Sequence, residues 1–230
     1  MLSIISLETL GLWLLSIMIP IMILYLFYLI LTKPFEYMGF STFEAVIIVL
    51  VSLVFRFEIF VSGFNISNIY LFSYNSWMIS INMGGAVIPI VLSFYLKYKK
   101  NIPIKKILVG VVIVSITAFF VTQPVVSKGI VSSFPYWLLP AFFASLASIF
   151  LSWKTFKKAA PLAYISGTLG VLIGADVLHL PELLNYQITV SKNAIIGGAN
   201  VFDMIYLTGI LAVIVDGIIM FKQRKKEGID

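Results

Sequence analysis

Seven long apolar stretches make up most of this chain, and they constrain its fold more than any other feature. Each is close to the roughly 20 residues that an α-helix needs to cross the hydrocarbon core of a bilayer. Hydrophobic residues account for 60% of the sequence and charged residues for only 11%, too apolar for a soluble domain of this length. We therefore expect an all-α integral membrane protein, one domain over residues 1–230, with spans at about 10–32, 42–62, 78–97, 107–124, 134–153, 160–180 and 199–221.

The positions of Lys and Arg predict how these spans are oriented. With the N-terminus outside, thirteen of the sixteen basic residues fall on the inner side, as the positive-inside rule requires. Six or eight spans would break this alternation. The exceptions are Arg56, Lys128 and Lys192. We therefore expect a multi-pass protein of the cell membrane, N-terminus outside and C-terminus inside. The net charge of +6 then reflects topology, and no nucleic-acid partner is expected.

The second span and the segment after it are less regular than the others. Arg56 and Glu58 interrupt the apolar stretch, so either the span ends early there or Arg56 neutralises a buried carboxylate. Residues 63–77 are rich in Asn, Ser and Tyr, a composition that favours a loop at the membrane interface with aromatic anchors.

Two aspartates within the last two apolar stretches indicate a function beyond spanning the bilayer. A carboxylate in hydrocarbon costs several kcal/mol unless it is paired, protonated or in contact with water. Asp176 lies five residues before Pro181, where the sixth span is expected to end, and Asp203 lies six residues after Gly197. At the helical rise both are within roughly 7–9 Å of the outer ends of their helices. We expect them to share one polar site that opens to the outer side.

Several other residues are expected to support this site. Gly174 belongs to a small-residue stripe that is typical of close helix packing, and Gly197 and Gly198 are expected to thin the start of the last span. A similar Gly-Gly-Ala triplet occurs at 84–86, through either a parallel duplication or chance. The remaining candidates are Asn82, Tyr206, Arg56 and the single histidine, His179. Asp216 lies thirteen residues beyond Asp203, and we expect it at the inner interface beside Lys222–226.

Two carboxylates within hydrogen-bonding reach share one proton, because both cannot ionise easily in a low dielectric. Such a pair can activate water with one carboxylate and donate from the other, as aspartic proteases do. The alternatives are a proton- or cation-coupled transporter, a structural pair, and a non-enzymatic assembly partner. His179 could complete a metal site with the aspartates, but a histidine bonded to a carboxylate at the interface is favoured. The chain has no cysteine, so a thiolate metal site is excluded, and we expect no metal or cofactor.

The aspartate pair resembles the presenilin and signal-peptide-peptidase superfamily of intramembrane aspartyl proteases, in which two neighbouring helices carry one aspartate each. In that superfamily the second aspartate closes a Gly-x-Gly-Asp motif. Here Gly197 and Gly198 lie five to six residues before Asp203, and no Pro-Ala-Leu triplet occurs. The resemblance covers one helical hairpin. It implies that Asp176 and Asp203 are catalytic and that the partners are transmembrane peptides in the lipid bilayer.

A second resemblance covers more of the chain. Segments 82–89, 164–170, 173–180 and 197–203 are similar to an archaeal and bacterial membrane family known as domain of unknown function 1614. The similarity extends over roughly residues 40–220. It implies a membrane protein and carries no activity with it.

Overall fold

The computed structural model describes residues 7–126, 128–153, 155–198 and 203–226, and most of them are helical. Three helical segments are long and apolar enough to cross a membrane: Gly11–Tyr37, Ile104–Val121 and Ala159–Asn185. Shorter apolar helices occupy Thr42–Val54, Tyr136–Leu151 and Met204–Ile219. The structure is therefore that of a membrane protein.

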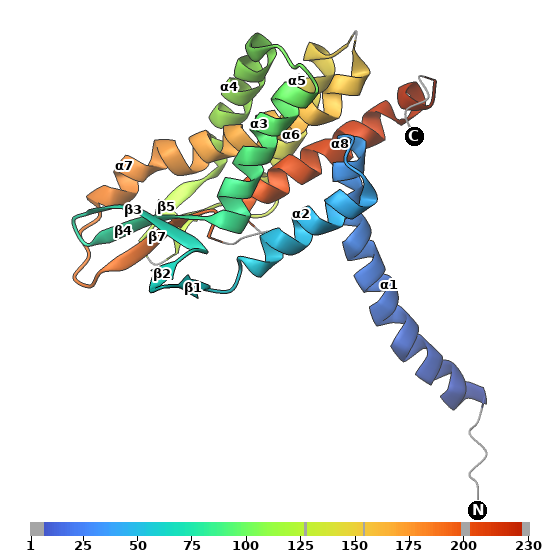
Figure 1. Ribbon diagram of the computed structural model, residues 1–230, viewed down its shortest axis with the longest axis horizontal. Coiled ribbons are helices and arrows are strands. Elements are labelled where there is room, and N and C mark those ends of the chain that lie inside the picture. Colours follow the sequence, from blue (N-terminus) through green and yellow to red (C-terminus); the bar gives the residue numbers. More distant parts are fainter. Residues whose placement is uncertain (1–6, 127, 154, 199–202, 227–230) are drawn as a thin grey trace, which may run out of the picture.

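Helix α1 (Leu7–Tyr37) extends away from the other elements over most of its length (Figure 1). Its side chains between Leu12 and Ile30 are almost all large, apolar and exposed. A helix that is apolar on every side needs an apolar environment, and α1 has little protein around it. Lipid is the medium that suits this surface. Only the last turns, with Leu31 and Phe35, enter the core.

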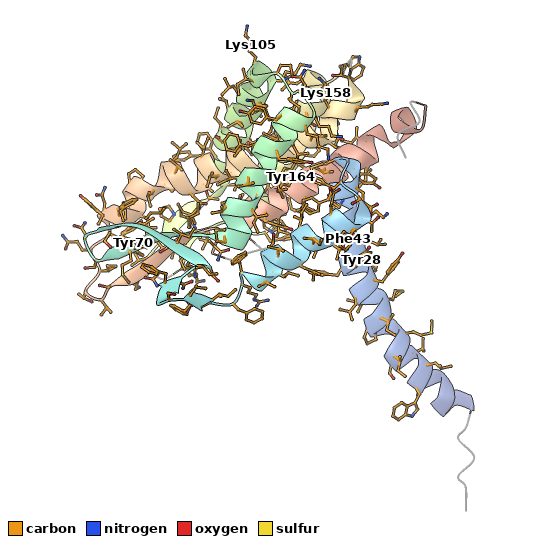
Figure 2. All side chains as sticks on the ribbon, viewed as in Figure 1. Tyr28, Phe43, Tyr70, Lys105, Lys158 and Tyr164 are labelled. Carbon is orange, nitrogen blue, oxygen red and sulfur yellow. The ribbon has the colours of Figure 1, made fainter. Side chains whose placement is uncertain are left out.

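The remaining helices form a bundle around α6 (Ala159–Val171), in which every residue except Leu169 is buried. Helix α6 packs against α3 (Ile88–Lys99), α4 (Ile104–Val121), α5 (Leu139–Leu151) and α8 (Met204–Lys226). Helix α2 (Thr42–Val54) packs against α1 and begins with a capping box between Ser41 and Glu44. Tyr164 lies near the middle of this bundle (Figure 2).

Glycines allow α6 to approach its neighbours closely. The Cα of Gly167 faces the backbone of Thr208 and Gly209 on α8, and Gly170 faces Val114 on α4. Gly174 is packed most tightly, because a Cβ there would lie 2.2 Å from the carbonyl oxygen of Ser115 on α4. The expectation that this glycine stripe packs against another helix is confirmed.

After α6 the helix continues with a change of geometry. A π-helical segment, η4 (Leu172–Val177), leads into α7 (Leu178–Asn185), so the helix runs through Pro181 and does not end there as expected. Short 3-10 turns, η2 (Tyr136–Leu138) and η3 (Phe156–Lys158), precede α5 and α6.

Three small sheets cover one end of the bundle, and the sequence did not predict them (Figure 1). Strands β3 (Asn68–Tyr74), β4 (Trp77–Asn82) and β7 (Lys192–Ile196) form a sheet in the order β3-β4-β7. The others are the pairs β1 (Phe60–Val61) with β2 (Phe64–Asn65), and β5 (Gln123–Val125) with β6 (Gly129–Val131). Lys105 and Lys158 lie at the opposite end of the bundle from Tyr70 of β3 (Figure 2).

These strands correct three of the predicted segments. Helix α2 ends at Val54, whereas the second span was expected to continue to about 62, and 55–62 forms a turn and β1. The stretch from 78 to 82 is strand β4, followed by the π-helical η1 (Met83–Val87) and α3. Segment 63–77 is mostly strand rather than loop. The last helix begins at Met204, and residues 199–202, the expected start of that span, lie outside the described residues.

The two Gly-Gly segments occupy similar places in the fold. Strands β4 and β7 pair in parallel, with Ile81 opposite Ile196, and each is followed by two glycines on the way to a helix. The echo seen in the sequence therefore corresponds to two adjacent strand ends.

The tight contact at Gly174 leads to a stability prediction. Gly174→Ala should lower the melting temperature in detergent, because the added methyl meets backbone of α4 and such overpacking costs about 1–3 kcal/mol. Gly11→Ala is the matched control, since no atom lies within 4 Å of a Cβ there. Equal melting temperatures for the two variants would contradict the close packing of α6 on α4.

Candidate functional site

A cavity of about 380 Å³ lies between the sheets and the end of the bundle that they cover. Its walls come from β4, β7, the turn between β5 and β6, and helix α7. Asp176 and Asp203 both line it, together with apolar side chains that include Trp77, Ile79 and Leu183. The described residues thus bring the two predicted aspartates into one site.

A second cavity, of about 350 Å³, is lined by the same two aspartates. Its other walls carry Thr122, Ser132 and Trp137 as well as apolar residues of η4 and α8. Because Asp176 and Asp203 border both cavities, the pair is accessible from two sides. As whole residues, both aspartates are partly exposed.

The π-helical segment positions Asp176. Within η4 the backbone bonds to the fifth residue back, as the Leu178 N–H does to the Ile173 carbonyl. Pro181 lies in the following turn and has no N–H to donate, so the ordinary helical ladder is interrupted close to Asp176. Single π-helical turns inside α-helices are frequent at functional sites. The local geometry at Asp176 therefore differs from that of an ordinary membrane-spanning helix.

Asp203 is held at the start of α8. Its Oδ1 accepts a hydrogen bond from the backbone N–H of Ile205 at 2.9 Å, and its carbonyl accepts from Leu207 N–H at 2.9 Å. This is the arrangement of an N-cap, where a side-chain oxygen satisfies a free backbone donor. The positive end of the helix dipole stabilises negative charge at this position. Residue 203 is therefore a cap as well as a cavity residue.

The two carboxylates are close enough to interact electrostatically. A pair in such proximity holds one proton more readily than two negative charges. The part of the chain that the structure describes contains no group of three or more His, Cys, Asp and Glu side chains that could hold a metal ion. A carboxyl group and a carboxylate that share one proton can act together as a general acid and a general base.

His179 points away from this site. Its ring stacks on Phe119 of α4 at 4.5 Å between centroids, and Nε2 lies 3.1 Å from the Phe119 carbonyl oxygen. Nδ1 is 3.6 Å from the Glu182 carboxylate. His179 is therefore a packed histidine that lines neither cavity. The expected hydrogen bond to a carboxylate is not formed, because Nδ1 has no hydrogen-bond partner among the described residues.

Asn82 is also structural, which corrects its expected role in the pocket. Its Nδ2 donates to the carbonyl of Ser67 and to Oδ1 of Asn68, and its Oδ1 accepts from the N–H of Gly85. These bonds cap η1 and tie β3 to the end of β4. A single amide thus organises the chain where the sheet meets the bundle.

Of the other supporting residues, some pack elements of the fold together and one lines a cavity. Gly174 and Gly197 serve close packing: Gly174 contacts α4, and Gly197, at φ +71°, lies against Gly85 and Ala86.

Tyr206 is buried in the core cluster with Tyr164 instead of facing the aspartates. Arg56 is exposed, past the end of α2, and lines neither cavity, so the span ends early there. Only Gly198 joins the aspartates in lining the first cavity.

Sequence reasoning missed Lys128 and Lys192, which line the first cavity with the aspartates. Both had been noted only as exceptions to the positive-inside pattern. That exception was the available signal, because a lysine on the side expected to be outside is not needed for topology.

The cap at Asp203 leads to a second stability prediction. Asp203→Ala should destabilise the protein by about 1 kcal/mol, because the cap of α8 is lost. Asp203→Asn should be close to the wild type in thermal denaturation, since asparagine caps a helix about as well. If Asn destabilises as much as Ala, the charge rather than the cap is what α8 requires.

Comparison with known proteins identifies a family for this chain but no activity. Residues 54–215 match the model of a family described as "Protein of unknown function (DUF1614)". No curated protein and no solved structure matches the chain, and the resemblance to presenilins remains a hypothesis. The matched region contains every residue that lines the two cavities and leaves out α1 and nearly all of α2. The chain belongs to the DUF1614 family.

Proposed function

We propose that the protein crosses the cell membrane seven times, with α1, α2, α3, α4, α5, the α6–α7 helix and α8, and with its N-terminus outside. Lys105 and Lys158, which lie at the end of the bundle opposite the sheets (Figure 2), support this orientation, because basic residues favour the inner side. The sheets and the aspartate cavities then lie on the outer side. The sheets there would sit at the membrane surface, where backbone groups can reach water.

We propose further that the protein is an intramembrane aspartyl protease with Asp176 and Asp203 as its catalytic pair. The observation that carries this proposal is that both aspartates border the same two cavities. A structural pair would need no cavity on either side. Its substrates would be peptide segments at the outer end of transmembrane helices.

The placement of the two groups suggests how they divide the reaction. Asp203, at the positive end of α8, is the ionised member and takes a proton from water as the water oxygen attacks the peptide carbonyl carbon. Asp176 gives its proton to the carbonyl oxygen, and a neutral tetrahedral diol results. Asp203 then returns its proton to the amide nitrogen as the C–N bond breaks. Asp176 regains a proton from one hydroxyl, which leaves a carboxylic acid and an amine.

The proposal is tested with isosteric variants in proteoliposomes that contain a membrane-tethered peptide reporter. Asp176→Asn and Asp203→Asn should each lower the rate of cleavage at least about 100-fold, since either change removes one member of the acid–base pair. Glu182→Gln is the matched control, because this exposed carboxylate is on the same helix as Asp176 but outside both cavities. Reporter cleavage that survives in both aspartate variants would refute the protease.

A second candidate function, proton- or cation-coupled transport, has its own support. We had expected Asp216 at the inner interface, but it is fully buried and its carboxylate accepts a hydrogen bond from Ser148 Oγ at 3.4 Å. Within the described residues, the buried hydroxyls that lack a hydrogen-bond partner include those of Ser145, Ser166, Thr168 and Thr208. Buried polar groups thus continue into the inner half, as a path for a proton or cation would require.

Transport and proteolysis are distinguished at Asp216. If the protein is a coupled transporter, Asp216→Asn should abolish uptake driven by a pH or cation gradient into proteoliposomes. If it is a protease, the same variant should keep the wild-type rate of reporter cleavage in all samples that fold. Gradient-driven uptake by the wild type, with no cleavage of any reporter, would favour the transporter.

A further inference from the structure

Two lysines stand at the cavity that holds the aspartates. Lys128 lies in the turn between β5 and β6, and Lys192 is the first residue of β7. Both line the cavity with Asp176 and Asp203. The ammonium of Lys192 donates to the carbonyl of Val126 at 3.3 Å, so it reaches across from β7 to the β5–β6 turn. The two positive charges therefore belong to one rim.

These charges are not used elsewhere in the part of the protein that the structure describes. Neither Lys128 nor Lys192 forms an ion pair with another described residue, unlike Lys33, which pairs with Glu36. Both ammonium groups belong to exposed residues. Most basic residues of the chain are on the opposite side, where they fix topology. An anionic group of a ligand is the partner that two lysines at a cavity rim would bind.

The strand beside the lysines favours a peptide over a lipid headgroup. The backbone N–H of Lys192 donates to the carbonyl of Ser76. The N–H and C=O groups of every second residue of β7, starting with Lys192, therefore point toward β4. The backbone N–H and C=O of Asn193 then point to the other edge of the sheet, and Asn193 lines the cavity. Among the described residues no strand pairs with this edge of β7, and such an edge is a template for an extended peptide. A lipid headgroup has no backbone to pair with it.

We propose that Lys128 and Lys192 bind a carboxylate of the substrate, so that the cavity selects extended peptide segments with Asp or Glu near the bond presented to the catalytic pair. This inference rests on the proposed proteolytic function. It defines the substrates as acidic segments just outside a membrane span. Such segments are compatible with the positive-inside rule, since the outer flanks of membrane helices are poor in Lys and Arg.

The selectivity is tested by exchanging charges on both sides. Three reporters differ only in carrying Glu, Gln or Lys beside the cleaved bond. The wild type should cleave the Glu reporter about tenfold faster than the Lys reporter, as one hydrogen bond to a charged group predicts. The double variant Lys128→Glu, Lys192→Glu should reverse this order. Lys105→Glu, at the other end of the bundle, should leave it unchanged.

Binding separates this inference from the proposed chemistry. The Kd values of fluorescent Glu and Lys peptides are measured with Asp203→Asn, which needs no catalysis. The inference is supported if the Glu peptide binds more tightly than the Lys peptide and the two lysine substitutions reverse this order. If that result is found but no reporter is cleaved, only the protease proposal fails. Equal Kd values overturn it. The inference is also overturned if the lysine variants bind each peptide with the same Kd as the protein with both lysines, and differ from it only in binding to vesicles that contain anionic lipid. A lipid phosphate would then occupy the rim.

Discussion

The close packing of α6 against α4 and α8 is the contact on which the rest of the structure depends. Gly167, Gly170 and Gly174 remove the side chains that would hold these helices apart. Helix α6 can then be buried on all sides, and the helix that continues from it reaches the end of the bundle that the sheets cover, beside the start of α8. Asp176 and Asp203 meet at this place. Their proximity follows from backbone contacts made one to three helical turns away.

The sequence predicted this part of the molecule well because its signals are local. A carboxylate within an apolar stretch and a glycine every three or four residues can be recognised without knowing the fold. Distances along a helix follow from its rise, and they gave an expected depth for each aspartate. The helix ends assumed for that estimate were wrong, because the helix continues through Pro181 and α8 begins only at Met204. The prediction that the two share a site needed nothing more than these local signals.

The sheets could not be predicted in the same way. The pairing of Trp77 with Lys192 joins residues far apart in the chain, and no pattern within either segment reveals it. Apolar strands such as β4 also look like the beginning of a helix when the next residues are apolar too. Asn82 and His179 were expected near the aspartates because only their positions along the chain could be used. Their neighbours Ser67 and Phe119 come from distant segments, and those contacts decide their orientation.

The central claim is that Asp176 and Asp203 share one site, and cysteine cross-linking tests it most directly. The chain has no cysteine, so Asp176→Cys with Asp203→Cys gives a protein with two thiols only. A short bifunctional thiol reagent should join them within one chain, as mass spectrometry would show. Asp176→Cys with Asp216→Cys, whose second position lies roughly 20 Å further along α8, should not be joined. Labelling of both thiols without a cross-link between 176 and 203, or equal yields for the two pairs, would contradict the account.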